Sequence, residues 1–425
     1  MIRKSIFFII LFTACLRITH AQTGFVNDLD TLLEWKKGYL DIHHFHTGRG
    51  NSAFFILPDG TTMMIDAGEM GGSFGTGQTL HISPAYPDES RTAAGWISSY
   101  VKQLIPKGKK PKIDYALITH FHADHYGSIT AASKTSAKGE YKLSGITAIA
   151  EEIPVGYLID RNYPLYNFPV DLRKYYKADA TFLNYLAFVD YQRRHNHILV
   201  DSLHTGATDQ IRLLNQPDLY PSFQILGIKS GPMLWDSKKG RNIQLLHADK
   251  LLEKGSFNEN PLSLAIKLSY GDFDYFTGGD NTGLSNYETP EWFDVETPMG
   301  ETVDKVDVTT FNHHGNRDAM NENFLKKLSP RVLVQQSWCS DHPGQELAYR
   351  LGSEKLYAGP RDVFATYIHP ETKITYGSWF VNAYASTEGH VMIRVYPGGR
   401  EYIVVILQTI GGVLTPKKVY GPYRS

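Results

Sequence analysis

Apolar and polar positions alternate along most of the chain in short runs typical of β-strands, interrupted by a few longer helical segments. Residues 93–104 and 178–194 carry apolar side chains at helical spacing, and we predict a helix over each. Residues 69–90 are rich in Gly, Ser and Pro and are predicted to form a long loop. This mixture predicts an α/β fold, with strands over 39–47, 52–57, 61–65, 113–119, 262–268, 273–277, 306–311, 332–336, 391–395 and 403–407.

Three of the predicted strands lead directly into residue types that ligate metals. The strand over 113–119 is followed by the segment HFHADH, residues 120–125. The strand over 273–277 is followed by Gly278, Gly279 and Asp280, and the strand over 306–311 leads into the pair His313 and His314. Because the same feature recurs at three separate strand ends, we predict a metal site where these ends meet.

The spacing within residues 120–125 suits two neighbouring ions. His120 and His122 stand at i and i+2, and extended backbone turns such a pair to one side, where both imidazoles can hold one ion. Asp124 and His125 enter the next turn and can reach a second ion beside it. Imidazole nitrogen and carboxylate oxygen are ligands that Zn²⁺ accepts readily.

The other two strand ends complete this prediction. Asp280 can place a carboxylate between the two ions, since Gly278 and Gly279 allow the backbone to approach closely. Either His313 or His314 then supplies the last ligand of the second ion. The pattern alone leaves the choice between these two histidines open.

The first residues have the layout of an export signal. Arg3 and Lys4 form a basic start, residues 5–16 are almost wholly apolar, and Ala21 suits cleavage by a signal peptidase. We therefore predict a signal peptide over 1–21 and an exported protein, periplasmic or extracellular, with a single domain over 22–425. A lipoprotein anchored through Cys15 is the less favoured alternative, and we expect no transmembrane segment in the mature chain.

Charge and cysteine content narrow the function classes. The chain has 43 Lys and Arg against 44 Asp and Glu, a formal charge of −1 that becomes −4 once Arg3, Lys4 and Arg17 are removed. This balance does not favour a protein that holds nucleic acid by bulk charge. Cys339 is the only cysteine left in the mature chain, so no intramolecular disulfide can form.

With these residues in place, the chain resembles the metallo-β-lactamase-fold hydrolases. The aspartate that ends an early strand in that family matches Asp66, and the H-x-H-x-D-H motif matches residues 120–125. The bridging aspartate matches Asp280, and the final histidine matches His313 or His314. The resemblance implies a four-layer αββα sandwich with the metals at one edge, here with an aromatic-rich insertion over roughly 150–250.

The order of the pieces is similar, more narrowly, to the hydrolase domain of competence DNA-uptake channel proteins. That group has a Gly-x-Gly turn after its opening strand, like residues 47–51, and an Asn-rich approach to the Asp strand, like the stretch from Asn258. It also has a late serine strand and a His-Pro turn, like Ser337 and His342-Pro343. The similarity extends from about Tyr39 to Leu407.

One departure from the family concerns the first ion. Many members have a third histidine before the Asp strand, whereas this chain has Asn258-Glu259-Asn260 there. His247 lies upstream and is one substitute; water, or an Asn or Glu ligand, is another. The resemblance implies two divalent ions, with zinc favoured and manganese or iron as alternatives.

The resemblance also implies roles for individual residues. A water that bridges the two ions is expected to lose a proton near neutral pH and become the nucleophile, oriented by Asp124 or Asp280. His342 is expected either to contact the substrate anion or to donate a hydrogen bond in the transition state. Asp66 is expected to hydrogen-bond a ligand histidine, because metal-bound imidazoles nearly always donate their other N–H. His46 is expected to support the site or the substrate without ligating a metal.

The motif predicts hydrolysis but does not specify the bond. The narrower resemblance favours a phosphodiester. The substrate is expected to be a small-molecule or polymeric ester or phosphoester, and the net charge favours a small-molecule substrate over nucleic acid. A lactone, ester or β-lactam hydrolase is one alternative, weakened by the missing third histidine. A non-catalytic surface module that binds through the aromatic insertion is another.

Overall fold

The computed structural model describes residues 32–71, 80–283 and 289–425. The predicted signal peptide, with Cys15, lies outside the described residues. Within the described residues the strands form two mixed sheets of nine strands each. None of the helices in these ranges is long and apolar enough to cross a membrane.

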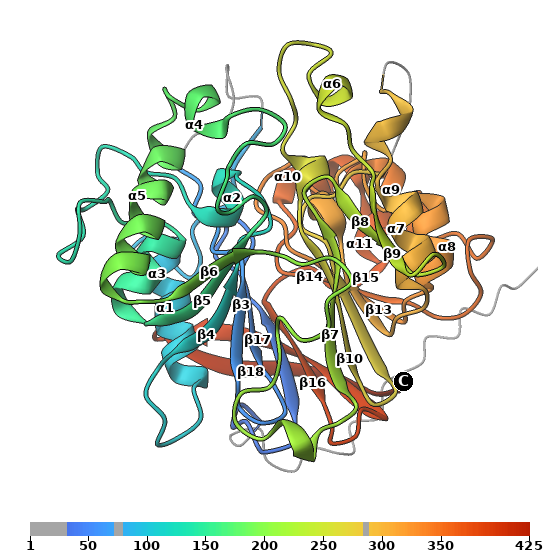
Figure 1. The fold of residues 1–425 in the computed structure, drawn as a ribbon. Helices are drawn as coiled ribbons and strands as arrows, with labels where there is room; N and C mark the ends of the chain where they lie inside the picture. Colours follow the sequence, from blue (N-terminus) through green and yellow to red (C-terminus); the bar gives the residue numbers. More distant parts are fainter. Residues whose placement is uncertain (1–31, 72–79, 284–288) are drawn as a thin grey trace, which may run out of the picture.

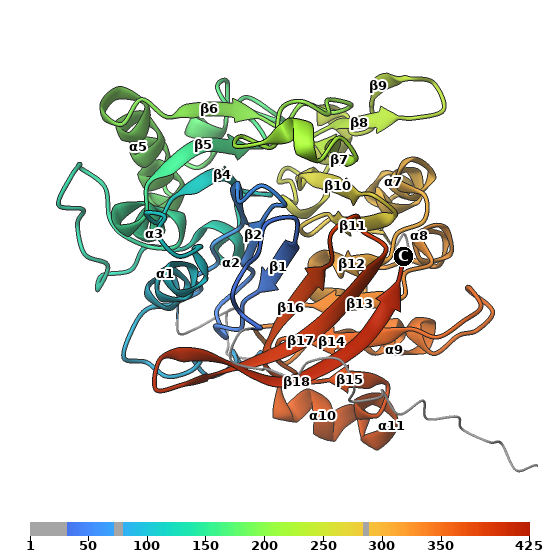
Figure 2. The ribbon, with the colours of Figure 1, turned by 90° about the horizontal axis from the view of Figure 1, so that it is seen from below.

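The first sheet joins strands from both ends of the chain (Figures 1 and 2). Strand β1 (Leu40–His44) pairs with the C-terminal strand β16 (His390–Val395) on one side and with the N-terminal strand β2 (Ala53–Ile56) on the other. In spatial order the strands are β18 (Val413–Arg424), β17 (Glu401–Ile410), β16 (His390–Val395), β1 (Leu40–His44), β2 (Ala53–Ile56), β3 (Thr62–Ile65), β4 (Ile113–Leu117), β5 (Val155–Asp160) and β6 (Leu199–Ser202).

The second sheet contains a parallel half and an antiparallel half. The strands from β11 to β15 run parallel to one another, whereas β7 to β11 are joined as antiparallel neighbours. In spatial order the strands are β15 (Tyr384–Ser386), β14 (Asp362–Ala365), β13 (Val332–Gln335), β12 (Val308–Thr310), β11 (Phe273–Thr277), β10 (Ala265–Tyr270), β7 (Phe223–Ser230), β8 (Met233–Asp236) and β9 (Arg241–Gln244).

Helices cover the outer faces of both sheets (Figure 1). The longer helices beside the first sheet are α1, α3 and α5, and those beside the second are α7, α8 and α9. The helices are α1 (Ala93–Leu104), α2 (Ala123–Tyr126), α3 (Ile146–Glu152), α4 (Leu172–Tyr175), α5 (Ala180–His195), α6 (Ala248–Leu251), α7 (Glu296–Val303), α8 (Glu322–Leu328), α9 (Gln345–Leu351), α10 (Pro370–Tyr376) and α11 (Ser378–Val381).

Three apolar layers hold these elements together. One cluster lies between the sheets and joins side chains such as Phe55 of β2 to Tyr275 of β11. A second cluster packs α1, α3 and α5 onto the first sheet, and a third packs α7, α8 and α9 onto the second. The order of layers is therefore helix, sheet, sheet, helix, which confirms the predicted αββα sandwich, the layout of the metallo-β-lactamase fold.

Local sequence explains where the two longest helices begin. The Thr92 side chain accepts a hydrogen bond from the Gly95 amide at 3.1 Å and caps α1, the helix predicted over 93–104. Asp179 caps α5 in the same way, accepting from the amides of Thr181 and Phe182. Each helix then buries residues three or four apart against the first sheet.

The aromatic-rich stretch over 150–250 is built into both sheets. It supplies β5 and β6 at one edge of the first sheet and β7, β8 and β9 at one edge of the second. Phe182, Tyr185 and Phe188 of α5 are buried in the cluster against the first sheet. These rings are therefore core residues and not an exposed binding platform.

Candidate metal centre

The predicted HFHADH segment forms a tight turn at the end of β4. Extended backbone at His122 turns its ring toward His120, and His120 Nε2 lies 3.0 Å from His122 Nδ1. The next residues form α2, which carries the buried side chains of Asp124 and His125. The turn therefore presents four metal-type side chains at the carboxyl end of a parallel strand, where ligands bind in α/β sheets.

Asp280 comes from the end of β11 in the other sheet. Gly279 precedes it with φ +54°, and a Cβ atom there would lie 2.8 Å from Thr119 Cβ, so only glycine lets the two sheet edges approach this closely. Asp280 Oδ1 lies 3.0 Å from His125 Nε2, and its Oδ2 lies 3.7 Å from His120 Nε2. One carboxylate thus faces histidines on both sides of the turn.

The two candidate histidines after β12 take different positions. Both have left-handed backbone, with φ 43° at His313 and 55° at His314, a strain of about 1–3 kcal/mol per residue that is typical of functional sites. His314 Nε2 lies 2.9 Å from Asp124 Oδ2 and 3.4 Å from Asp280 Oδ2. The structure therefore brings His314 into the cluster.

His313 lies beside the cluster instead of within it. Its Nδ1 lies 2.6 Å from Asp318 Oδ1, and its Nε2 lies 3.0 Å from the side-chain amide nitrogen of Asn260. Asn260 belongs to the segment 258–260, which the resemblance matches to the place of the family's third histidine. Its Oδ1 is buried and has no hydrogen-bond partner among the described residues.

The ligand-type atoms of the described residues form three groups, and two of these groups share Asp280. Within each group, these atoms lie within 4.8 Å of one another. His125 Nε2 and Asp280 Oδ1 are buried atoms without a hydrogen bond in the described part of the chain. The donor set of imidazoles and carboxylates thus fits a dinuclear metal site, with one group of Asp124, His125, Asp280 and His314 and another of His120, His122 and Asp280.

The charges of the cluster also point to cations. Burial opposes charge on His125 and His314, but the neighbouring carboxylates raise both pKa values, that of His314 to about 10. Burial likewise opposes charge on Asp124 and Asp280, but the histidines hold the pKa of each carboxyl well below its usual value. The two carboxylates therefore stay ionised, and without metal they are balanced by protons on histidine.

Hydrogen bonds outside the cluster set the orientation of its rings. His125 Nδ1 donates to Asp66 Oδ2 at 2.7 Å, so its Nε2 is the free nitrogen that faces Asp280. His314 Nδ1 lies 3.0 Å from the carbonyl oxygen of Gln336 and donates to it, which turns His314 Nε2 inward. Asp66, which was expected to hydrogen-bond a ligand histidine, accepts this bond from His125.

Some contributors were not identified from the sequence. Trp338 Nε1 donates to Asp124 Oδ2 at 2.9 Å, and Asn51 Oδ1 lies 3.1 Å from His314 Nδ1. Buried Glu296 accepts from Asn312 Nδ2 and from the amides of Met320 and Asn321, each at 2.7 Å, and so holds the loop that carries His314. No local motif distinguishes such residues, because their contacts join segments far apart in the chain.

The remaining predicted residues lie at different distances from the centre. His342 is buried and stacks on His314, with ring centroids 4.5 Å apart, and burial next to His314 lowers its pKa to about 3. His46 is buried between Tyr86 and Tyr367, and no contact joins its ring to the cluster within the described residues. His247 is exposed at the start of α6 and belongs to neither group.

No protein-family model matches the sequence, and no relative is found among the curated proteins. The solved structures similar to the chain include a mutant of the CmlA β-hydroxylase, at 13% identity and a TM-score of 0.33, with 69% of this chain and 45% of that chain covered. Zinc-bound PqqB from Methylobacterium extorquens is 10% identical, with a TM-score of 0.31 and coverage of 67% and 75%. Unliganded yeast PDE1 is 11% identical, with a TM-score of 0.35 and coverage of 84% and 99%.

Proposed function

We propose that this chain is an exported, dinuclear metal-dependent hydrolase that cleaves phosphodiesters. The observation that supports the proposal most strongly is the shared carboxylate: Asp280 faces two groups of ligand atoms that come from both sheets. The signal-like residues 1–21 support export to the periplasm or the extracellular space. Zinc is the favoured metal, with manganese or iron as alternatives.

When bound, a pair of divalent cations polarises the reacting oxygen of the substrate and lowers the pKa of a water molecule. The protein's own part is to hold its groups in place. Asp124 is fixed by Trp338 and His314, so its carboxylate can orient a water molecule by accepting a hydrogen bond from it. His342 is neutral at pH 7, because burial lowers its pKa to about 3, and can donate a hydrogen bond without adding charge.

The surroundings of the first group favour a phosphodiester over a neutral lactone or ester. This group has three ligand residues, His120, His122 and Asp280, and His122 is only partly buried. The opening beside His122 is lined by Lys250, Lys254 and Arg317. A phosphodiester carries its negative charge before and after attack, so cations at the entrance favour it over a neutral ester ring.

The test is metal analysis of the mature protein together with turnover of bis-p-nitrophenyl phosphate. We expect about two equivalents of metal per chain and hydrolysis that Asp124→Asn or Asp280→Asn reduces at least a hundredfold. Asp59→Asn is the matched control, because Asp59 is a buried carboxylate that accepts backbone hydrogen bonds from Asn215 and Gln216. Turnover of nitrocefin or an acyl-lactone without phosphodiester cleavage would replace the proposal with the alternative hydrolase. A protein that stays metal-free and inactive after reconstitution would favour a binding module.

A further inference from the structure

A cleft of about 790 Å³ opens beside the candidate metal centre, a size typical of a small-molecule site. His122 of the first ligand group contributes to its lining. The loop after α6 and the 3-10 helix over Glu291–Phe293 also contribute, as does the loop after His314. A molecule in this cleft therefore lies next to the ion that His122 would hold.

Three cations line the cleft without a counterion among the described residues. Lys250, Lys254 and Arg317 are exposed, and none of them forms an ion pair or a side-chain hydrogen bond with a described residue. Three acids line the same cleft, and Asp318 among them is bound to His313. Asp341 is hydrogen-bonded to the neutral thiol of Cys339, and Glu253 forms no ion pair with a described residue, so the three cations face two acids that no cation pairs. The chain as a whole is close to neutral, so this concentration of unpaired positive charge is local.

Aromatic side chains accompany these cations. Phe257, Trp292 and Phe293 line the same cleft and are partly buried. Phe257 is fixed in place by Tyr175, whose ring centroid lies 4.8 Å away. Partly exposed rings next to Lys and Arg form a surface on which a flat ring can stack while an attached anion meets the cations.

From this juxtaposition we propose that the cleft selects a small phosphodiester that carries a second negative charge and a flat aromatic ring, as a short 5′-phosphorylated nucleotide does. The proposal rests on the phosphodiesterase function proposed above. The reacting phosphodiester lies at the metal centre, the second anion meets Arg317 and the two lysines, and the ring packs against Trp292 and Phe257. The same cations disfavour a substrate whose free arm is cationic, such as a choline ester.

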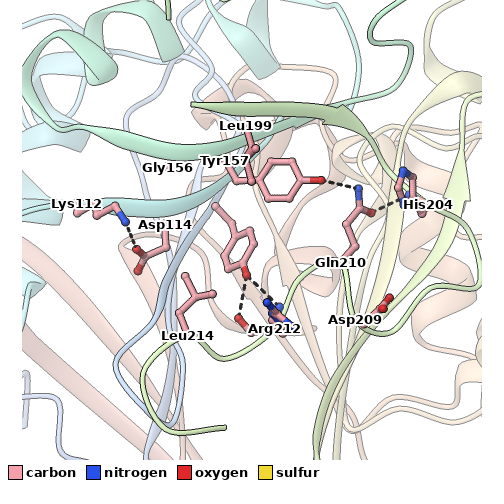
Figure 3. Close-up of a pocket in the computed structure, with 11 residues that line it drawn as sticks. Lys112, Asp114, Gly156, Tyr157, Leu199, His204, Asp209, Gln210, Arg212 and Leu214 are labelled. Atoms are coloured by element: carbon pink, nitrogen blue, oxygen red, sulfur yellow. Dashed lines mark hydrogen bonds and ion pairs between the residues drawn. The ribbon is translucent and has the colours of Figure 1, made fainter. Parts of the chain in front are cut away.

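A second pocket differs from the cleft in its position and in the pairing of its polar groups. That pocket, of about 520 Å³, lies between β5, β6 and the 204–214 loop (Figure 3). Its polar groups bind one another: Lys112 pairs with Asp114 at 2.8 Å, and Gln210 donates to the Tyr157 hydroxyl at 3.3 Å. Asp114 stands near the amino end of β4, about 20 Å of extended chain before His120, so the pocket does not adjoin the metal centre.

The test compares the specificity constant, kcat/KM, for three substrates of the metal-loaded protein. They are the dinucleotide pApA with a 5′-phosphate, the same dinucleotide ApA without it, and p-nitrophenyl phosphorylcholine. We expect pApA to be at least tenfold better than ApA, and p-nitrophenyl phosphorylcholine to be the poorest. Arg317→Gln should reduce the preference for pApA about tenfold, and Trp292→Ala should weaken both dinucleotides roughly fivefold to a hundredfold.

Lys355→Gln is the control, because Lys355 is an exposed lysine outside the cleft without an ion pair to a described residue. Hydrolysis of bis-p-nitrophenyl phosphate without any preference for pApA would overturn the inference and leave the proposed function intact. The same holds if Arg317→Gln keeps the full preference for pApA, or if Trp292→Ala cleaves both dinucleotides as well as the unaltered protein does. Failure to hydrolyse any phosphodiester would overturn the proposed function. In that case the binding of 5′-AMP is measured by calorimetry. Binding that Arg317→Gln weakens would still support the assigned ligand class, whereas no binding of 5′-AMP would overturn the ligand class as well.

Discussion

The hydrogen bond between Asp66 and His125 gives the sharpest single-residue prediction. Asp66 Oδ1 accepts from the Thr119 amide at 2.8 Å, and Oδ2 accepts from His125 Nδ1 at 2.7 Å. In Asp66→Asn the backbone amide of Thr119 still requires an oxygen, so the new NH₂ group must face His125. An NH₂ donor requires an acceptor at Nδ1, which moves the His125 proton to Nε2.

Protonated at Nε2, His125 can no longer offer that nitrogen to a cation. The substitution itself fits the site, because asparagine tolerates the left-handed backbone at this position, where φ is 59°. Loss of such an outer hydrogen bond lowers metal affinity about 10- to 100-fold, which is about 1.4–2.7 kcal/mol. We therefore expect the affinity for the second ion to fall by this factor while the fold remains intact.

The assay is a zinc titration against a chromophoric chelator, with thermal unfolding of the metal-free protein as the test of folding. Asp59→Asn serves as the control, because Asp59 also accepts a hydrogen bond from a backbone amide, that of Asn215, but is distant in sequence from residues 120–125. If Asp66→Asn binds both equivalents of zinc within twofold of the unaltered protein, the proposed role of Asp66 in fixing the His125 tautomer is wrong.

Other predictions concern charge buried in the fold. Burial lowers the pKa of His44 to about 4 and of His390 to about 3, so the stability that depends on their neutral forms is complete above pH 6.5 and is lost as the pH falls toward these values. The free energy of unfolding of the metal-free protein, measured in urea, should thus fall by about 1.6 kcal/mol per histidine between pH 6.5 and 5, and in His390→Gln it should fall by correspondingly less. An equal pH dependence in the two proteins would contradict this. Zinc binding at pH 7 should release protons from the two histidines that the carboxylates keep protonated, measured with a pH indicator in weak buffer; no release would show that they are neutral without metal. Arg161→Met leaves Glu259 buried without its cation and should lower the free energy of unfolding by about 3–5 kcal/mol in urea, whereas a loss below 1 kcal/mol would show that the pair is dispensable.

Much of the fold followed from local patterns. The helix over 93–104 has the predicted bounds, and the strands that lead to the site end within two residues of the prediction. Strands β5 to β9 were not predicted, because their residues are held by pairing with strands distant in sequence, such as β4 and β10. The pattern of residue types did not distinguish them from loop.

The site shows the same division between local and tertiary information. The spacing of residues 120–125 placed their side chains in one turn, since alternation along extended backbone is a local property. The choice between His313 and His314 depended on the left-handed backbone of both and on Gln336, which directly follows β13. The neighbours Trp338 and Asn51 are contacts across the two sheets, and the sequence carries no local signal for them.

The central claim is that two cations bind side by side with Asp280 between them. Anomalous diffraction from crystals grown with zinc tests this most directly. We predict two peaks about 3.5–4 Å apart, one among His120, His122 and Asp280 and the other among Asp124, His125, Asp280 and His314. Zinc peaks that all lie away from Asp280, or no peak at this edge of the sheets, would contradict it.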